Sequence, residues 1–154
     1  MNHRELAGNL FLEGYNCAQA VFTAFSDVTG FDKETSLKLS SSFGGGMGRM
    51  REVCGAVSGA LMVAGALWGY ADTDDAKKKE HYALVQEFAR RFKEKHQTIN
   101  CFELLKGIET DTSPLPTIRD AEYYKKRPCL RFVEDAAEIL DNLIEEKMSC
   151  QPIG

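Results

Sequence analysis

The stretch REVCGAVSGALMVAGALWG, from Arg51 to Gly69, decides the expected fold. Residues 53–71 carry no charge, and a segment of this length could span a bilayer. Gly55 and Gly59 have the spacing that lets two helices approach closely. The other apolar segments are amphipathic and need an apolar surface to pack on, so we favour a buried central helix over a membrane span.

Helical spacing of apolar residues dominates the rest of the chain. A first helix containing Leu6 and Leu10 is expected to end near Gly14. Further helices are expected at residues 17–27, weakly at 31–43, at 72–97, at 101–106, and from Pro128 onward. The intervening segment 107–128 is mostly loop, with a short helix from Thr117. The sequence predicts an all-α protein, one compact domain over residues 1–154, with five to seven helices around the small-residue helix.

Composition and charge argue against nucleic-acid binding, and the N-terminal sequence argues against secretion. The chain has 154 residues, of which 27% are charged, and a net charge of −4 without a long basic tract, so nucleic acid is not an expected partner. The N-terminal MNHRELAGNLFLEG lacks the unbroken apolar stretch of a signal peptide. We therefore expect a reducing, cytoplasmic setting, where widely spaced cysteines are more often metal-binding or catalytic than disulfide-bonded.

Four of the five cysteines fall at expected helix starts. NCAQ and NCFE each resemble a capping box, with Asn16 or Asn100 as N-cap and the cysteine next to it. In RPCLRF, Pro128 suits the first helical position and places a cysteine in the first turn, and another cysteine opens the apolar stretch. These four are Cys17, Cys54, Cys101 and Cys129, whereas Cys150 lies in the tail MSCQPIG and is left out.

A helix N-terminus favours a thiolate, the form of cysteine that binds metals and attacks disulfides. Arg49 and Arg51 precede Cys54 and would add to this effect. One cysteine in such a position is often only a small buried hydrophobe, but four favour a shared site. The chain has no C-x-x-C, so that site must be assembled from four distant segments.

The glycine-rich GGGMGR, residues 44–49, does not fit a nucleotide-binding loop, because it lacks both G-K-[ST] and G-x-G-x-x-G. Its glycines instead favour close approach of the backbone to Cys54. Gly55 and Arg49 are the candidate cofactor-binding residues, with Arg49 expected to hold a nearby anion.

CGAVSG, Cys54 to Gly59, resembles the Cys-Gly-Ala-x-x-Gly signature of the C-GCAxxG-C-C family of redox-active proteins. Cys17 before the signature and Cys101 and Cys129 after it follow that family's cysteine order over nearly the whole chain. The resemblance implies a redox or metal-binding role for these four cysteines. A related domain accompanies haem in split-Soret cytochromes, where four cysteines are associated with a [2Fe–2S] cluster. This chain has no C-x-x-C-H, so covalent haem is not expected.

Three hypotheses follow. In the first, the four thiolates bind a [2Fe–2S] cluster or cycle between thiol and disulfide, with Cys17–Cys54 and Cys101–Cys129 as a guessed pairing, for electron transfer to an unidentified redox partner. In the second, they hold a structural zinc ion without redox chemistry. In the third, the apolar segment associates with a membrane, which we disfavour. The residues leave open whether the protein is an enzyme and whether it forms homo-oligomers.

Overall fold

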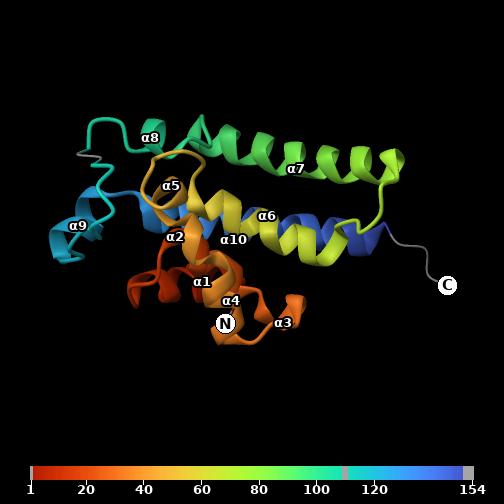
Figure 1. The fold of residues 1–154 in the computed structure, drawn as a ribbon, viewed down its shortest axis with the longest axis horizontal. Helices are drawn as coiled ribbons and strands as arrows, with labels where there is room; N and C mark the ends of the chain where they lie inside the picture. Colours follow the sequence, from red (N-terminus) through yellow and green to blue (C-terminus); the bar gives the residue numbers. More distant parts are fainter. Residues whose placement is uncertain (1, 109–110, 151–154) are drawn as a thin grey trace.

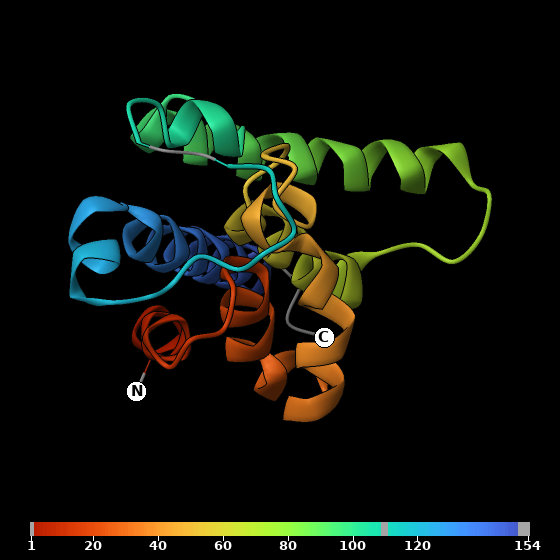
Figure 2. The same cartoon turned by 60° about the vertical axis from the view of Figure 1, so that its left-hand side comes forward.

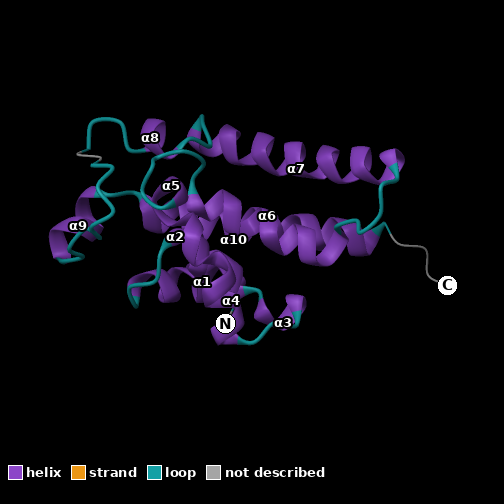
Figure 3. Cartoon of the chain, viewed as in Figure 1, coloured by secondary structure: helices purple, strands orange, loops and turns teal. Residues whose placement is uncertain are grey.

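The computed structural model describes residues 2–108 and 111–150, and its backbone is mainly helical (Figures 1 and 3). Within those ranges the structure contains no strand, and the only β-type pairing is an isolated antiparallel bridge between Val53 and Asn100. The predicted all-α class is confirmed. The elements in chain order are α1 His3–Leu12, α2 Cys17–Ala24, α3 Ser26–Thr29, α4 Lys33–Ser40, the 3₁₀ helix η1 Ser41–Phe43, α5 Gly44–Met47, α6 Gly55–Trp68, α7 Asp75–His96, α8 Cys101–Leu104, α9 Ala121–Lys126 and α10 Cys129–Ser149.

The expected count of five to seven helices is too low, because the chain adds short turns between its long helices. The described residues form ten α-helical segments, of which α1, α2, α4, α6, α7 and α10 have eight or more residues. The predicted helix 17–27 is split into α2 and α3. At the break the Ser26 hydroxyl donates to the carbonyl of Thr23, and the N–H of Phe25 donates to the carbonyl of Phe22.

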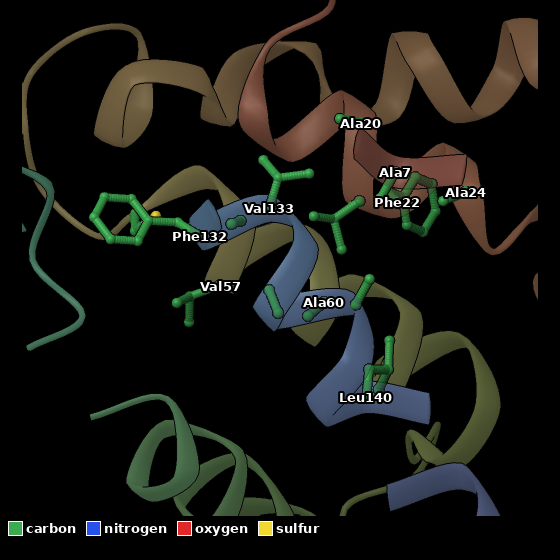
Figure 4. Packing of buried hydrophobic residues seen from close by; sticks show 14 of the residues in the cluster. Ala7, Ala20, Phe22, Ala24, Val57, Ala60, Phe132, Val133 and Leu140 are labelled. Carbon is green, nitrogen blue, oxygen red and sulfur yellow. The ribbon is translucent and has the colours of Figure 1, made fainter. Parts of the chain in front are cut away.

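The buried centre is shared by α10 and α6. Helix α10 packs against α1, α2, α6 and α7, and Phe132, Val133 and Leu140 point into the core (Figure 4). Helix α6 adds small side chains such as Val57 and Ala60 to the same core.

The prediction that residues 53–71 form a helix buried on all sides is only partly right. The helix is shorter, and Gly65 and Ala66 in its second half are exposed. No helix in the described part of the chain combines the length and the apolar character needed to cross a membrane.

Two features outside this centre position the site. Helix α7 lies along one side of the molecule and buries Phe88 and Phe92. Residues 111–119, here called the strap, connect the region of α8 to α9 and run past the glycine-rich segment (Figure 2). Because the strap has no helix of its own, its position depends on side chains from other segments.

Candidate functional site

Four cysteines from four distant segments line one cavity of about 690 Å³. Three of them are the first residues of α2, α8 and α10, and the fourth is the N-cap of α6. Cys150 lies exposed at the other end of α10. The structure therefore brings together Cys17, Cys54, Cys101 and Cys129, the four cysteines that the sequence singled out.

Local capping places two of these cysteines as predicted. The Asn16 side chain accepts the N–H of Gln19 at 2.9 Å, and the Gln19 side chain accepts the N–H of Asn16 at 3.1 Å, which completes a capping box. The Asn100 side chain likewise accepts the N–H of Glu103 at 3.0 Å. Pro128 is the N-cap of α10 rather than its first residue, so the expected position was off by one.

Backbone hydrogen bonds hold the segments of Cys54 and Cys101 together. The N–H of Cys54 donates to the carbonyl of Ile99 at 2.8 Å, and the N–H of Cys101 donates to the carbonyl of Glu52 at 2.6 Å. These two bonds flank the isolated bridge and fix both helix starts at one edge of the cavity.

Glycines remove the side chains that would keep the cysteines apart. A Cβ on Gly55 would lie 2.9 Å from the carbonyl oxygen of Phe43 and 3.1 Å from the Cβ of Cys17. A Cβ on Gly46 would lie 2.7 Å from the Cβ of Cys101, and the φ of Gly46 is +70°. Gly59, one turn further along α6, packs on the backbone of Ala18. The first and last glycines of CGAVSG thus let α6 approach α2 closely.

The side chains of Cys17 and Cys129 interact directly. The Cys17 thiol donates a hydrogen bond to the sulfur of Cys129, which together with burial raises the pKa of Cys17 well above its usual value. The same hydrogen bond lowers the pKa of Cys129, and the positive charges of Arg127, Arg119 and Arg51 act in the same direction. Cys129 is therefore the thiol that most readily carries negative charge, and the contact differs from the guessed Cys17–Cys54 pairing.

Burial outweighs the helix N-terminus at the other two sulfurs. It raises the pKa of Cys54 to about 12, although the backbone N–H groups of Ala56 and Val57 act in the opposite direction. It also raises the pKa of Cys101, against the opposing effect of Arg51. The expectation that the helix starts lower the cysteine pKa is therefore wrong for Cys17, Cys54 and Cys101, and the lowered pKa of Cys129 comes from Cys17 and the arginines rather than from its helix start.

The cavity is positively charged. Four arginines line it, whereas no carboxylate side chain of the described residues does; the arginines are Arg49, Arg51, Arg119 and Arg127. Arg51 is only 5% exposed, and its Nη1 lies 3.9 Å from the Cys101 sulfur. Its Nε and Nη2 donate to the carbonyl of Asp111 at 3.2 and 3.0 Å.

Arg49 holds the strap over the cavity. Its guanidinium donates to the carbonyls of Ser113 and Leu115 and, at 2.8 Å, to the hydroxyl of Thr117. Arg49 was predicted to hold an anion, and it does line the cavity, but its hydrogen bonds go to the strap. Gly55, the other predicted cofactor-binding residue, also lines the cavity.

Sequence reasoning missed three cavity residues, Arg119, Tyr123 and Arg127. Arg119 donates from Nη1 to the carbonyls of Phe11 and Tyr15 at 2.9 and 3.0 Å. Arg127 lies over the ring of Tyr123, 5.0 Å from its centroid. All three belong to a segment without regular spacing, and the one available signal was the position of Arg127 two residues before Cys129.

The described donor side chains do not form a site for a single metal ion. Within residues 2–108 and 111–150, no three His, Cys, Asp or Glu side chains are grouped closely enough to hold one metal ion. His96, near Cys101 in sequence, instead hydrogen-bonds Asp135 at 2.8 Å.

Comparison with known proteins identifies a family for the chain. A family model described as "Putative redox-active protein (C_GCAxxG_C_C)" matches residues 15–143, a range that contains all four cavity cysteines and ends before Cys150. The curated proteins and the solved structures compared with the chain gave no significant match. Since the family model covers most of the sequence, the chain belongs to the C_GCAxxG_C_C family of redox-active proteins.

Proposed function

We propose that this protein transfers electrons through a [2Fe–2S] cluster held by Cys17, Cys54, Cys101 and Cys129. The observation that carries the proposal is the convergence of these four sulfurs on one arginine-lined cavity. A [2Fe–2S] cluster takes four cysteine thiolates, two on each iron, so it does not require three donors around one ion. Once bound, the cluster would supply one-electron oxidation and reduction.

The protein's own groups would stabilise and tune the sulfurs. The backbone N–H groups of Ala56 and Val57 at the start of α6 favour negative charge on Cys54, and the Arg51 guanidinium faces Cys101. Hydrogen bonds and positive charge at ligand sulfurs raise the reduction potential of a cluster, whereas burial of net negative charge lowers it. The arginines also offset the negative charge of four thiolates in a site where burial opposes ionisation.

The contact between Cys17 and Cys129 favours a second candidate, reversible dithiol chemistry. Exchange with a disulfide oxidant would join their sulfurs: a thiolate attacks that disulfide and breaks its S–S bond, the second thiol displaces the remaining half, and the oxidant leaves as two thiols that carry the two electrons and two protons. Cys129, with its lowered pKa, is the attacking thiolate, and Cys17 completes the bond. If this candidate is right, mild oxidation of the metal-free protein yields a Cys17–Cys129 disulfide, which peptide mass mapping identifies.

The geometry gives less support to a structural zinc site. Four cysteine sulfurs around Zn²⁺ lie about 2.3 Å from one central ion. The described cysteines do not form such a group, and no other His, Asp or Glu completes one there. Zinc therefore remains the alternative outcome of the metal analysis rather than the proposal.

Metal analysis of protein purified without air tests these candidates. The cluster predicts about two irons per chain, acid-labile sulfide and visible absorption that bleaches on reduction. About one zinc per chain and no visible absorption band would contradict the cluster and support the structural zinc site. Absence of metal, with a thiol count that falls by two on oxidation, would support the dithiol instead. A metal-free protein whose thiol count does not respond to oxidants would contradict both redox candidates.

A further inference from the structure

The cavity carries more positive charge and more space than its sulfurs require. Its volume of about 690 Å³ is in the range of small-molecule sites, which is far larger than a single ion needs. The walls combine the four cysteines with the glycine-rich segment, the strap and Tyr123. A group bound by the sulfurs would thus leave room for a second ligand beside it.

Three of the guanidiniums that line the cavity are held by neutral acceptors. In the part of the chain that the structure describes, the acceptors of Arg49, Arg51 and Arg119 are backbone carbonyls, the Thr117 hydroxyl and the Cys101 sulfur, and none of the three forms an ion pair with a carboxylate. Neutral acceptors fix the direction of a guanidinium without cancelling its charge. Arg119 makes both of these bonds through Nη1, which leaves its second terminal nitrogen for a ligand.

The backbone around two of these arginines is strained. Arg49 and Arg51 have φ angles of +68° and +60°, a region that costs non-glycine residues about 1–2 kcal/mol each. Residues held in such conformations cluster at binding and catalytic sites. Here the strained backbone directs both side chains toward the strap and the cavity.

We propose that this cavity binds a small oxyanion, a carboxylate- or phosphate-bearing molecule, beside the four cysteines and against Arg119 and its neighbouring arginines. Arginine forks match both kinds of oxyanion, and the lack of a lining carboxylate among the described residues removes the main source of repulsion. The site goes beyond the proposed electron transfer, because it adds a ligand that neither a cluster nor a disulfide requires.

Ligand-induced stabilisation of the purified protein tests the site. Thermal unfolding is followed at constant ionic strength with increasing inorganic phosphate, in parallel with succinate and with neutral succinamide. Phosphate or succinate should raise the midpoint along a saturable curve, because a ligand that binds only the folded state stabilises it. Succinamide should not, and the stronger of the two anions identifies the ligand class. No saturable effect of either anion, or an equal effect of succinamide, would overturn the proposal.

A matched pair of variants locates the effect. Arg119→Gln removes one cavity charge, and Arg90→Gln removes one charge on the exposed surface of α7, where Arg90 pairs with Glu87 and Glu94. We expect Arg119→Gln to weaken the affinity about tenfold, a size typical of a charged hydrogen bond, and Arg90→Gln to leave it unchanged. Equal weakening by both variants would assign the effect to overall charge and contradict the site.

Arg119 also binds two carbonyls, so an experiment on the unmodified chain is needed in case that variant does not fold. In the reduced, metal-free protein, the alkylation rates of Cys129 by iodoacetate and by neutral iodoacetamide are compared at one pH. The ratio of the two rates at Cys129 is compared with the same ratio at Cys150, which is exposed. Both reagents react with the thiolate, so the thiolate content of each cysteine cancels in its ratio of iodoacetate to iodoacetamide rates. A cationic cavity attracts the iodoacetate anion and should raise this ratio at Cys129 about tenfold or more. Equal ratios at the two cysteines would overturn the proposal independently of metal content or disulfide formation.

Discussion

Three non-glycine residues of the glycine-rich segment have positive φ, namely Met47, Arg49 and Arg51. The sequence predicted close approach of the backbone near Cys54 from these glycines, whereas Gly46 approaches Cys101 instead, with its Cβ position 2.7 Å from the Cβ of Cys101. It could not predict that the arginines share the left-handed conformation, because no local pattern requires it. Their conformation depends on the strap, which lies more than sixty residues away in sequence.

The pKa values of the cysteines also depend on contacts that local sequence does not predict. Capping signals placed Cys17 and Cys101 at helix starts correctly, since those signals are local. Burial is not local, and it decides the pKa of Cys54 and Cys101. At Cys54 and Cys101 the buried helix start therefore holds a protonated thiol until a metal ion replaces the proton.

Gly55→Ala should destabilise the protein and separate two of its sulfurs. The added methyl group would meet the Phe43 carbonyl at 2.9 Å and the Ala18 nitrogen at 3.0 Å, both backbone atoms that cannot swing aside. Overpacking of this kind costs about 1–3 kcal/mol. Denaturant unfolding measures the loss in free energy of unfolding.

Gly65→Ala is the matched control in the same helix. Nothing lies within 4 Å of its Cβ position, and the residue is exposed. Alanine should stabilise α6 there by about 0.5–1 kcal/mol, the usual helical preference over glycine. Stabilisation by both substitutions would show that Gly55 is not needed for close packing.

At the scale of elements, periodicity predicted the long helices well. Helix α7, Asp75–His96, lies inside the predicted 72–97, and α10 begins one residue after Pro128. Helix α9 begins at Ala121 rather than Thr117, because residues 111–119 are held by Arg49 and Arg51 instead of by helical bonds. Segments whose structure depends on distant side chains were thus the ones that periodicity misplaced.

A buried carboxylate joins three helices. Asp135 of α10 accepts hydrogen bonds from Arg4 of α1 at 2.7 Å and from His96 of α7 at 2.8 Å, and it is 6% exposed. Asp135→Asn should lower the free energy of unfolding by about 2–4 kcal/mol, since the charge that pairs with Arg4 is lost and one of the two oxygens that accept from Arg4 and His96 becomes an NH2 donor.

The control is Glu34→Gln, which breaks an exposed pair with Lys38 on α4. Exposed pairs of this type contribute less than about 0.5 kcal/mol. Urea unfolding compares the two variants, and losses of similar size would refute a structural role for the buried network.

His3 makes the packing of α1 depend on pH. Its ring stacks on Phe25 and hydrogen-bonds Asp141 of α10 at 2.6 Å and Asp27 of α3 at 2.9 Å. Burial lowers the pKa of His3, but the two carboxylates more than offset this and raise it above 6.5. The stabilisation is therefore fully present below the unfolded-state pKa of 6.5 and is lost as pH rises through the folded-state value.

We expect the free energy of unfolding to fall between about pH 6 and pH 8, and the fall to be smaller in His3→Gln. Urea titrations of both proteins over this range measure the difference. An identical pH slope in the two proteins would mean that His3 does not couple α1 to the carboxylates.

At the scale of the whole molecule, the sequence could suggest that the four cysteines converge on one site, but it could not establish this. The shared position at helix starts and the family's cysteine order indicated a common site. The contacts that build it lie between segments far apart in the chain, such as Cys54 with Ile99 and Cys17 with Cys129. The strap and its arginines complete the cavity, and no sequence motif marked them.

The central claim is that four cysteines act as one unit and the fifth does not. The most direct test is the iron content of anaerobically purified single Cys→Ser variants at all five positions, compared with the unmodified chain. We predict loss of most of the iron at Cys17, Cys54, Cys101 and Cys129, and full retention at Cys150, which is exposed and outside the cavity. Wild-type iron in the four cavity variants, or equal loss in all five, would contradict the account.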